Sequence, residues 1–205
     1  LETLKKLSDV NENKVVNFWQ IIDPKVSWEF LIGIYLSIFN TKKWIQASAK
    51  VDKEKLKDVG VWSNFENTCL HPIVIAEAFK DSQCYICSDA LSVNLVGERE
   101  WGDLYEFIEI VRIPELLDYY RKQGFAYINF FKCKNFSLRN YTNYFFKILF
   151  GGKKKGRIYI NYRKHFINNL IYPNFYFSFL FFLLKKIKYI VKKLFKFSEK
   201  TGKNK

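Results

Sequence analysis

The sequence has no methionine, only two histidines, and a single acidic residue beyond position 131. The two histidines, His71 and His165, are too few and too far apart for a HExxH motif or another site built on paired histidines. The segment 151–156 (GGKKKG) lacks the spacing of a P-loop and the Ser or Thr that follows its lysine, and no GxGxxG occurs. Residue spacing alone therefore gives no complete active site. Because even residue 1 is not methionine, we expect a fragment or a processed product.

What the sequence does contain is enough apolar surface for a folded core. Apolar residues make up 49% and aromatic residues 19% of the 205 positions, which excludes a globally disordered chain. A chain of this length buries roughly two-thirds to three-quarters of the surface that its unfolded form exposes. We therefore expect one domain or slightly more.

The charge is divided unevenly along the chain. Residues 1–131 carry 15 basic and 19 acidic side chains, whereas residues 132–205 carry 19 basic side chains and one acidic side chain, Glu199. The net charge is thus −4 in the first part and +18 in the second. A basic half of this kind favours an anionic partner, either nucleic acid or the anionic surface of a membrane.

The basic half contains an apolar segment followed by an amphipathic one. Residues 166–184 include no charged residue, but Pro173 and three asparagines leave only about eleven strongly apolar residues, too few for a clear membrane span. In the continuation KKIKYIVKKLFKF, an angle of about 100° per residue puts the aliphatic residues on one side and the lysines on the other flank. This pattern predicts a basic helix that lies at a membrane surface, although whether residues 166–184 span or lie on the bilayer stays open.

Hydrophobic runs and turn residues predict the individual elements. The four cysteines include the CxxC pair Cys84 and Cys87, which we interpret as ordinary core residues because no second pair accompanies it. The elements that we predict are a buried helix over 28–39, a charged helix or loop over 51–60, a helix from Pro72 and a strand over 84–95. Two helical stretches follow, the second from Pro114 to Gly124, and then a helix over 135–150.

Three segments in the middle of the chain carry a family resemblance. They are residues 27–44 (SWEFLIGIYLSIFNTKKW), 62–79 (WSNFENTCLHPIVIAEAF) and 84–101 (CYICSDALSVNLVGEREW). Their order resembles the carboxy-terminal half of bacterial GT-A type inverting nucleotide-sugar glycosyltransferases of family 2, in particular the abequosyltransferase-like branch. The segment 113–124 (IPELLDYYRKQG) also looks like the following helix of related capsule and lipopolysaccharide transferases. The resemblance covers roughly residues 28–124.

This resemblance implies a helix-rich α/β fold, namely the acceptor half of a GT-A domain with few strands. It implies transfer of a sugar from a nucleotide-sugar donor to a lipid-linked or surface-glycan acceptor. The family binds a divalent metal, Mg²⁺ or Mn²⁺, through a DxD motif that this chain lacks, so catalysis by the isolated chain is in doubt.

The resemblance also implies roles for particular residues. His71 matches the family's histidine and is the candidate general base, with Glu66 as second candidate, because inverting transfer needs a base for the acceptor hydroxyl. Arg99 and Trp101 are candidates for binding diphosphate or sugar, and Asn94 lies in the same polar loop. Ordinary structural roles remain open: a helix-start histidine, a solvated carboxylate and a core tryptophan.

These observations predict four regions: residues 1–131, the acceptor side of the transferase; 132–165, a basic aromatic helical connector; 166–197, a membrane-associating helix; and 198–205, a disordered tail. We expect a peripheral location at the cytoplasmic face of the inner membrane. Two alternatives stay open, a nucleic-acid-binding protein suggested by KKKGRIYINYRKH and a non-catalytic membrane-bound interaction protein; the uncharged run disfavours nucleic acid. The candidate membrane-binding lysines are Lys185, Lys186, Lys188, Lys192, Lys193 and Lys196.

Overall fold

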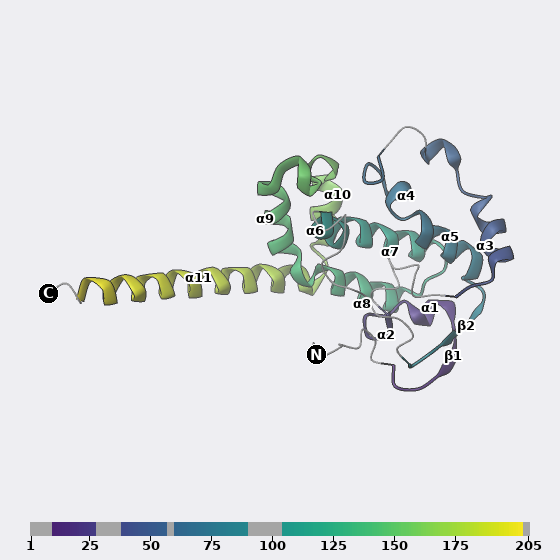
Figure 1. Ribbon diagram of the computed structural model, residues 1–205, viewed down its shortest axis with the longest axis horizontal. Helices are drawn as coiled ribbons and strands as arrows, with labels where there is room; N and C mark the ends of the chain where they lie inside the picture. The colour runs from purple at the N-terminus through teal and green to yellow at the C-terminus, as the bar shows by residue number, and fades with distance from the viewer. Residues whose placement is uncertain (1–9, 28–37, 57–59, 90–103, 203–205) are drawn as a thin grey trace.

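The computed structural model describes residues 10–27, 38–56, 60–89 and 104–202, and it is rich in helix (Figure 1). Two short strands, β1 (Lys14–Asn17) and β2 (Gln83–Ile86), pair antiparallel with Val15 opposite Tyr85. The predicted helix-rich α/β class is confirmed at this level. Of the strand that we predicted over 84–95, only the first residues form a strand, because residues 87–89 follow β2 without strand structure. The rest of this prediction lies outside the described residues, as does most of the predicted helix 28–39.

Helices make up most of the described structure. Those of the first half are α1 (Phe18–Ile21), α2 (Pro24–Ser27), α3 (Thr41–Ser48), η3 (Lys53–Leu56), α4 (Phe65–Thr68) and α5 (Leu70–Phe79). Those of the second half are α6 (Tyr105–Phe107), η5 (Ile108–Arg112), α7 (Ile113–Lys122), α8 (Tyr127–Ser137), η6 (Leu138–Asn140), α9 (Tyr141–Gly151), η7 (Gly152–Lys155), η8 (Arg157–Tyr159), α10 (Tyr162–Phe166), η9 (Ile167–Asn169) and α11 (Pro173–Gly202).

The central element is a continuous helical run through α6, η5 and α7. We predicted two helical stretches, the second beginning at Pro114, but the two form one run that begins at Tyr105. The reason is the π-helical turn η5, in which Ile113 donates its backbone N–H to the oxygen of Ile108. Proline has no N–H to continue the α-helical hydrogen-bond pattern. The wider π turn directly before α7 allows the helix to continue through Pro114. The proline is therefore accommodated inside a longer helix.

The core joins both halves of the sequence. Its largest fully buried side chains include Phe18, Phe107, Tyr120, Phe125 and Tyr141. Phe130 and Cys133 belong to the same cluster and lie on α8, so this helix runs through position 131 without a break. One packed core therefore includes residues from both sides of the change in charge.

The helix that we predicted over 135–150 is divided in two. α8 ends at Ser137, the 3₁₀ turn η6 follows, and α9 begins at Tyr141. The sequence Ser-Leu-Arg-Asn at this point has the buried Ser137 and Leu138 followed by the half-buried Arg139 and Asn140, and the Ser137 hydroxyl bonds to the backbone oxygen of Lys134, which competes with continued helix. The break lets α9 fold back beside the first turns of α11.

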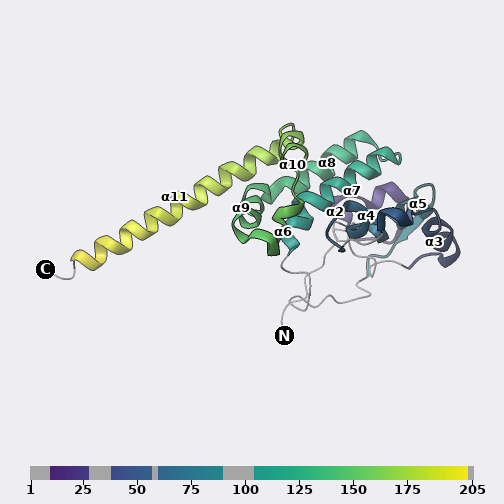
Figure 2. The ribbon, with the colours of Figure 1, turned by 90° about the horizontal axis from the view of Figure 1, so that it is seen from above.

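α11 is the longest helix, with 30 residues, and it begins with proline at the position where a missing N–H costs least. Its first turns pack against α9, η6 and α8. The remainder extends away from the globular part as a single rod (Figures 1 and 2).

Candidate functional site

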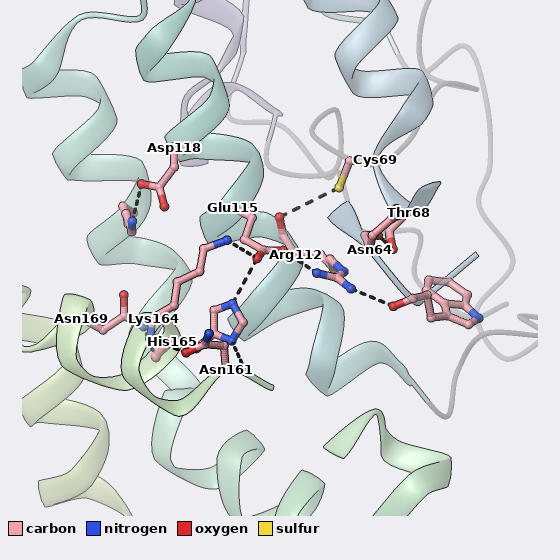
Figure 3. A network of polar contacts seen from close by, with 12 residues as sticks. Asn64, Thr68, Cys69, Arg112, Glu115, Asp118, Asn161, Lys164, His165 and Asn169 are labelled. Atoms are coloured by element: carbon pink, nitrogen blue, oxygen red, sulfur yellow. Dashed lines mark hydrogen bonds and ion pairs between the residues drawn. The ribbon is translucent and has the colours of Figure 1, made fainter. Parts of the chain in front are cut away.

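The most densely connected polar group of the described residues surrounds Glu115 in the first turn of α7 (Figure 3). Its carboxylate accepts hydrogen bonds from the guanidinium of Arg112 at 2.5 Å and from Lys164 Nζ at 2.6 Å. His165 Nε2 lies 3.1 Å from the same carboxylate. Arg112 also donates to the backbone oxygen of Trp62 at 2.7 Å. The network therefore connects α7 both to α10 and to the turn before α4.

Local structure fixes the position of His165 within this network. The backbone N–H of Asn161 donates to His165 Nδ1 at 3.1 Å, so this nitrogen is an acceptor and Nε2 carries the proton toward Glu115. The backbone oxygen of His165 accepts from Tyr141 Oη at 2.8 Å and from Asn169 Nδ2 at 2.6 Å. These contacts attach α10 and η9 firmly to α7 and α9.

The electrostatics of Glu115 follow from its partners. Burial alone raises the pKa of this carboxyl, but the hydrogen bonds from His165 and Lys164 and the charge of Arg112 outweigh it and lower the pKa to about 2. The side chains of Arg112 and Glu115 are only 4% and 8% exposed. The carboxylate is thus ionised and neutralised within the protein.

Two further carboxylates of the same helical run are paired in the same way. Glu106 lies 2.9 Å from Lys147 and 3.5 Å from Lys155, and Glu109 lies 2.7 Å from Arg139. Burial raises the pKa of Glu106, but the hydrogen bond and charge of Lys147 give a net lowering. The buried acids of the first half are therefore neutralised by cations of the basic half, which indicates a structural role for this row of charges.

Sequence reasoning missed this network. The signal that could have found it is the spacing of Glu106, Glu109, Arg112 and Glu115, three residues apart, which places four charged side chains along one side of a helix that is otherwise apolar. The charged partners of the three glutamates in the basic half could not be named from sequence, because they lie 30 to 50 positions downstream and meet the helix only through the tertiary fold.

The predicted catalytic candidates lie on α4 and α5. His71 is the second residue of α5 and is exposed, and it lines a shallow pocket of about 140 Å³. Glu66 lies on α4, does not line this pocket, and is 3.7 Å from Lys55 with 36% of its side chain exposed. The pocket is lined by Trp44, Ser48, Val51, Lys53, Leu56, Leu70, His71 and Val74. Of the two candidates, therefore, only His71 lines the pocket.

The other predicted binding residues and the metal can be placed only in part. Arg99, Trp101 and Asn94 lie outside the described residues. Within the described ranges, no group of three or more His, Cys, Asp or Glu side chains could hold a metal ion. Cys69 and Cys133 are free thiols, and burial raises the pKa of each to about 12.

The surface of α11 is unusual because large apolar side chains are exposed along it. The inner side of the helix is buried through Phe175 and Ser178, and Phe182 stacks on Phe146 with ring centroids 5.0 Å apart. On the far side lies what we call the apolar stripe, which consists of Tyr176, Leu180, Leu184, Ile187 and Val191, each 42–56% exposed. At about 100° per residue these five fall within an arc of roughly 80°, opposite the inner side. The stripe therefore faces away from the globular part.

The lysines of α11 lie outside this stripe. Lys185, Lys186 and Lys193 continue the inner side of the helix beyond the point where it leaves α9, and Lys188 and Lys192 lie on its flank. All five are exposed, whereas the side chain of Lys196 lies outside the described part. The rod is therefore amphipathic along the part that projects into solvent.

Within the described ranges no single helix has both the length and the apolarity to cross a membrane. Taken together, residues 162–169 and 173–193 satisfy the criterion of length and composition, but these two segments meet at an angle of 96°.

Comparison with known proteins provides no relative: no family model, curated protein or solved structure matches the chain. The resemblance to glycosyltransferases therefore stays a prediction.

Proposed function

We propose that this chain is a peripheral membrane protein that binds anionic bilayers through α11. The observation that carries the proposal is the apolar stripe, which faces away from the globular part and is flanked by exposed lysines. A helix of this kind lies in the interfacial plane, with its apolar side at the boundary of the acyl chains and its cations among the headgroups. A hydrophobic side exposed to water over several turns is otherwise uncommon in a monomeric protein.

The energetics favour a surface-lying helix over a spanning one. Each large side chain of the stripe that leaves water gains about 1.5–3 kcal/mol, and each lysine near an anionic surface adds about 1 kcal/mol. A charge at the centre of a bilayer costs about 2.5–3.5 kcal/mol even on the mildest scales. Because lysines recur from Lys185 to Lys193, insertion across the membrane would bury several of them.

The transferase activity remains a prediction that rests on the resemblance. A helix at the membrane surface suits an enzyme that uses a lipid-linked glycan. His71, the candidate base from the resemblance, lies beside the pocket with Trp44. A nucleotide-sugar donor and a location at the cytoplasmic face of the inner membrane belong to the same prediction. In the competing hypothesis the lysines bind nucleic acid, but this hypothesis gives the apolar stripe no role.

The test of the proposal is a comparison of two charge variants in vesicle flotation. Lys188→Gln, Lys192→Gln and Lys193→Gln together remove three charges of α11, and we expect a loss of about 3 kcal/mol, or roughly a hundredfold weaker partition onto vesicles of phosphatidylserine and phosphatidylcholine. The matched control removes three exposed lysines of the globular part, Lys14, Lys42 and Lys50, and is expected to bind as the unaltered chain does.

Equal loss of flotation in both variants would mean that only the net charge matters and would contradict the proposal. Retention of single-stranded oligonucleotide without any vesicle binding would favour the nucleic-acid alternative instead.

A further inference from the structure

We propose that the membrane contact includes a second element, the elbow, which consists of residues 166–172, from the last residue of α10 to the residue before α11. This inference rests on the proposed function and extends it from the rod to the globular part. The elbow exposes Ile167, Leu170 and Ile171, with exposed fractions of 54%, 37% and 66%. Exposed aliphatic side chains adjacent to one another in sequence and next to the stripe extend the apolar surface beyond α11.

The elbow lies at the end of the apolar stripe. Tyr176, the first residue of the stripe, donates its hydroxyl to the backbone oxygen of Leu170 at 2.6 Å. On the inner side the rings of Phe166 and Phe175 meet at 5.2 Å. The elbow and the stripe therefore form one continuous surface, with the buried contacts of α11 behind it.

The elbow is also held in a fixed shape. Tyr172 is buried and packs against Phe131 at a centroid distance of 5.0 Å, and Asn169 donates to the backbone oxygen of His165 at 2.6 Å. Asn174 forms two hydrogen bonds with Asn135 across the start of α11, at 2.8 and 2.9 Å. A side chain such as Ile171 therefore reaches outward from a rigid base, which reduces the conformational entropy lost on binding.

The positive charge around the elbow favours an anionic lipid surface as its binding partner. From residue 132 to residue 198 the chain has no acidic residue, and Arg163 on α10 is exposed beside the elbow. In Figure 2 the globular part lies to one side of the line of α11, so that a flat surface can follow the helix as far as the elbow. With two contacts, rod and elbow, the bilayer fixes the orientation of the globular part instead of leaving it free about a flexible anchor.

The experiment uses the full chain with vesicles of phosphatidylserine and phosphatidylcholine. Ile167→Ser with Ile171→Ser is compared with Ile45→Ser and Val61→Ser, which alter side chains of similar exposure (56% and 58%) far from the elbow. We expect the elbow variant to partition about tenfold more weakly and to keep its salt dependence, and the control to bind normally. Hydrogen exchange of the unaltered chain should slow over residues 166–172 as well as along α11 when vesicles are added.

The possible outcomes separate the two proposals. Protection confined to α11, with normal partition of the elbow variant, overturns the elbow and leaves the function of α11 in place. Absence of vesicle binding by the unaltered chain overturns both. Protection of the elbow that depends on protein concentration and not on vesicles would show that a second copy of the chain covers it, and this would also overturn the inference.

Discussion

Glu115 accepts hydrogen bonds from two cations. Arg112 lies on the same helical run, whereas Lys164 lies on α10, far along the chain. A buried ion pair of this kind contributes little net stability compared with an apolar pair, but the removal of one partner leaves the other charge buried and uncompensated. The network around Glu115 therefore attaches the C-terminal segment to the central helix, and its loss should destabilise the whole fold.

Glu115→Gln should lower the free energy of unfolding by about 3–5 kcal/mol, because Arg112 and Lys164 lose their carboxylate. The matched control is Glu66→Gln, which removes an exposed carboxylate 3.7 Å from Lys55 and should cost less than about 1 kcal/mol. Urea unfolding followed by circular dichroism measures both. Equal and small losses would show that the buried network does not hold the C-terminal segment.

The stability should also depend on pH through Glu115. Its pKa is about 2 in the folded protein against 4.5 ordinarily, so the folded state binds its proton more weakly than the unfolded state does. The contribution, about 3 kcal/mol, is fully present above pH 4.5 and is lost as the pH falls toward 2. Urea midpoints of the unaltered chain and of Glu115→Gln between pH 7 and pH 2.5 should therefore converge at the acid end. If the two midpoints changed with pH in parallel, Glu115 would not be the source of the pH dependence.

At the scale of single elements, the tight turn at Gly156 places η8 against the central helix. Gly156 has φ +80°, and a Cβ at this position would lie 2.8 Å from Cγ of the fully buried Phe107. Sequence analysis could predict a turn in GGKKKG, but not which of its glycines must remain glycine. That requirement comes from the contact with Phe107, about fifty positions upstream.

Gly156→Ala should therefore destabilise the protein by about 2 kcal/mol or more, since the left-handed conformation costs roughly 1–2 kcal/mol and overpacking roughly 1–3 kcal/mol. Gly60→Ala has open space around its Cβ and is the control, with an expected change of less than about 0.5 kcal/mol. Thermal unfolding of the two variants provides the comparison. Similar melting temperatures for both would contradict the packing of η8 on Phe107.

The apolar stripe makes a prediction that is specific to one side of α11. Ile187→Ser with Val191→Ser removes two side chains that would enter the acyl boundary, and the partition coefficient on anionic vesicles should fall about a hundredfold. Tyr189→Ser alters a still more exposed residue on the lysine side and should change the partition coefficient less than about threefold. A larger effect of Tyr189→Ser would place the other side of the helix against the membrane.

Prediction from sequence succeeded where the signal was local and failed where partners were distant. The periodicity of 185–196 is sufficient to place Lys188 and Ile187 on different sides of a helix, and α11 has that form. The end of α7 near Gly124 was also predicted correctly from helix-ending signals. A helical stretch upstream of Pro114 was predicted, but not that it is continuous with α7, because proline signals a helix start unless a π turn precedes it.

At the scale of the whole molecule, the basic half has two different uses. Its first part neutralises buried acids through Arg139, Lys147 and Lys164, and contributes Cys133, Tyr141 and other side chains to the common core. Its last part, α11, projects from that core with exposed lysines and the apolar stripe. The excess of positive charge at the molecular surface is therefore concentrated on the rod, where an anionic bilayer can meet it.

The measurement that tests this account most directly is flotation of the full chain with phosphatidylcholine vesicles that contain or lack phosphatidylserine, over a range of salt concentrations. The account predicts strong binding only with phosphatidylserine, weakened by salt as the lysines are screened, with residual binding from the stripe. Absence of binding to the anionic vesicles at low salt would contradict it.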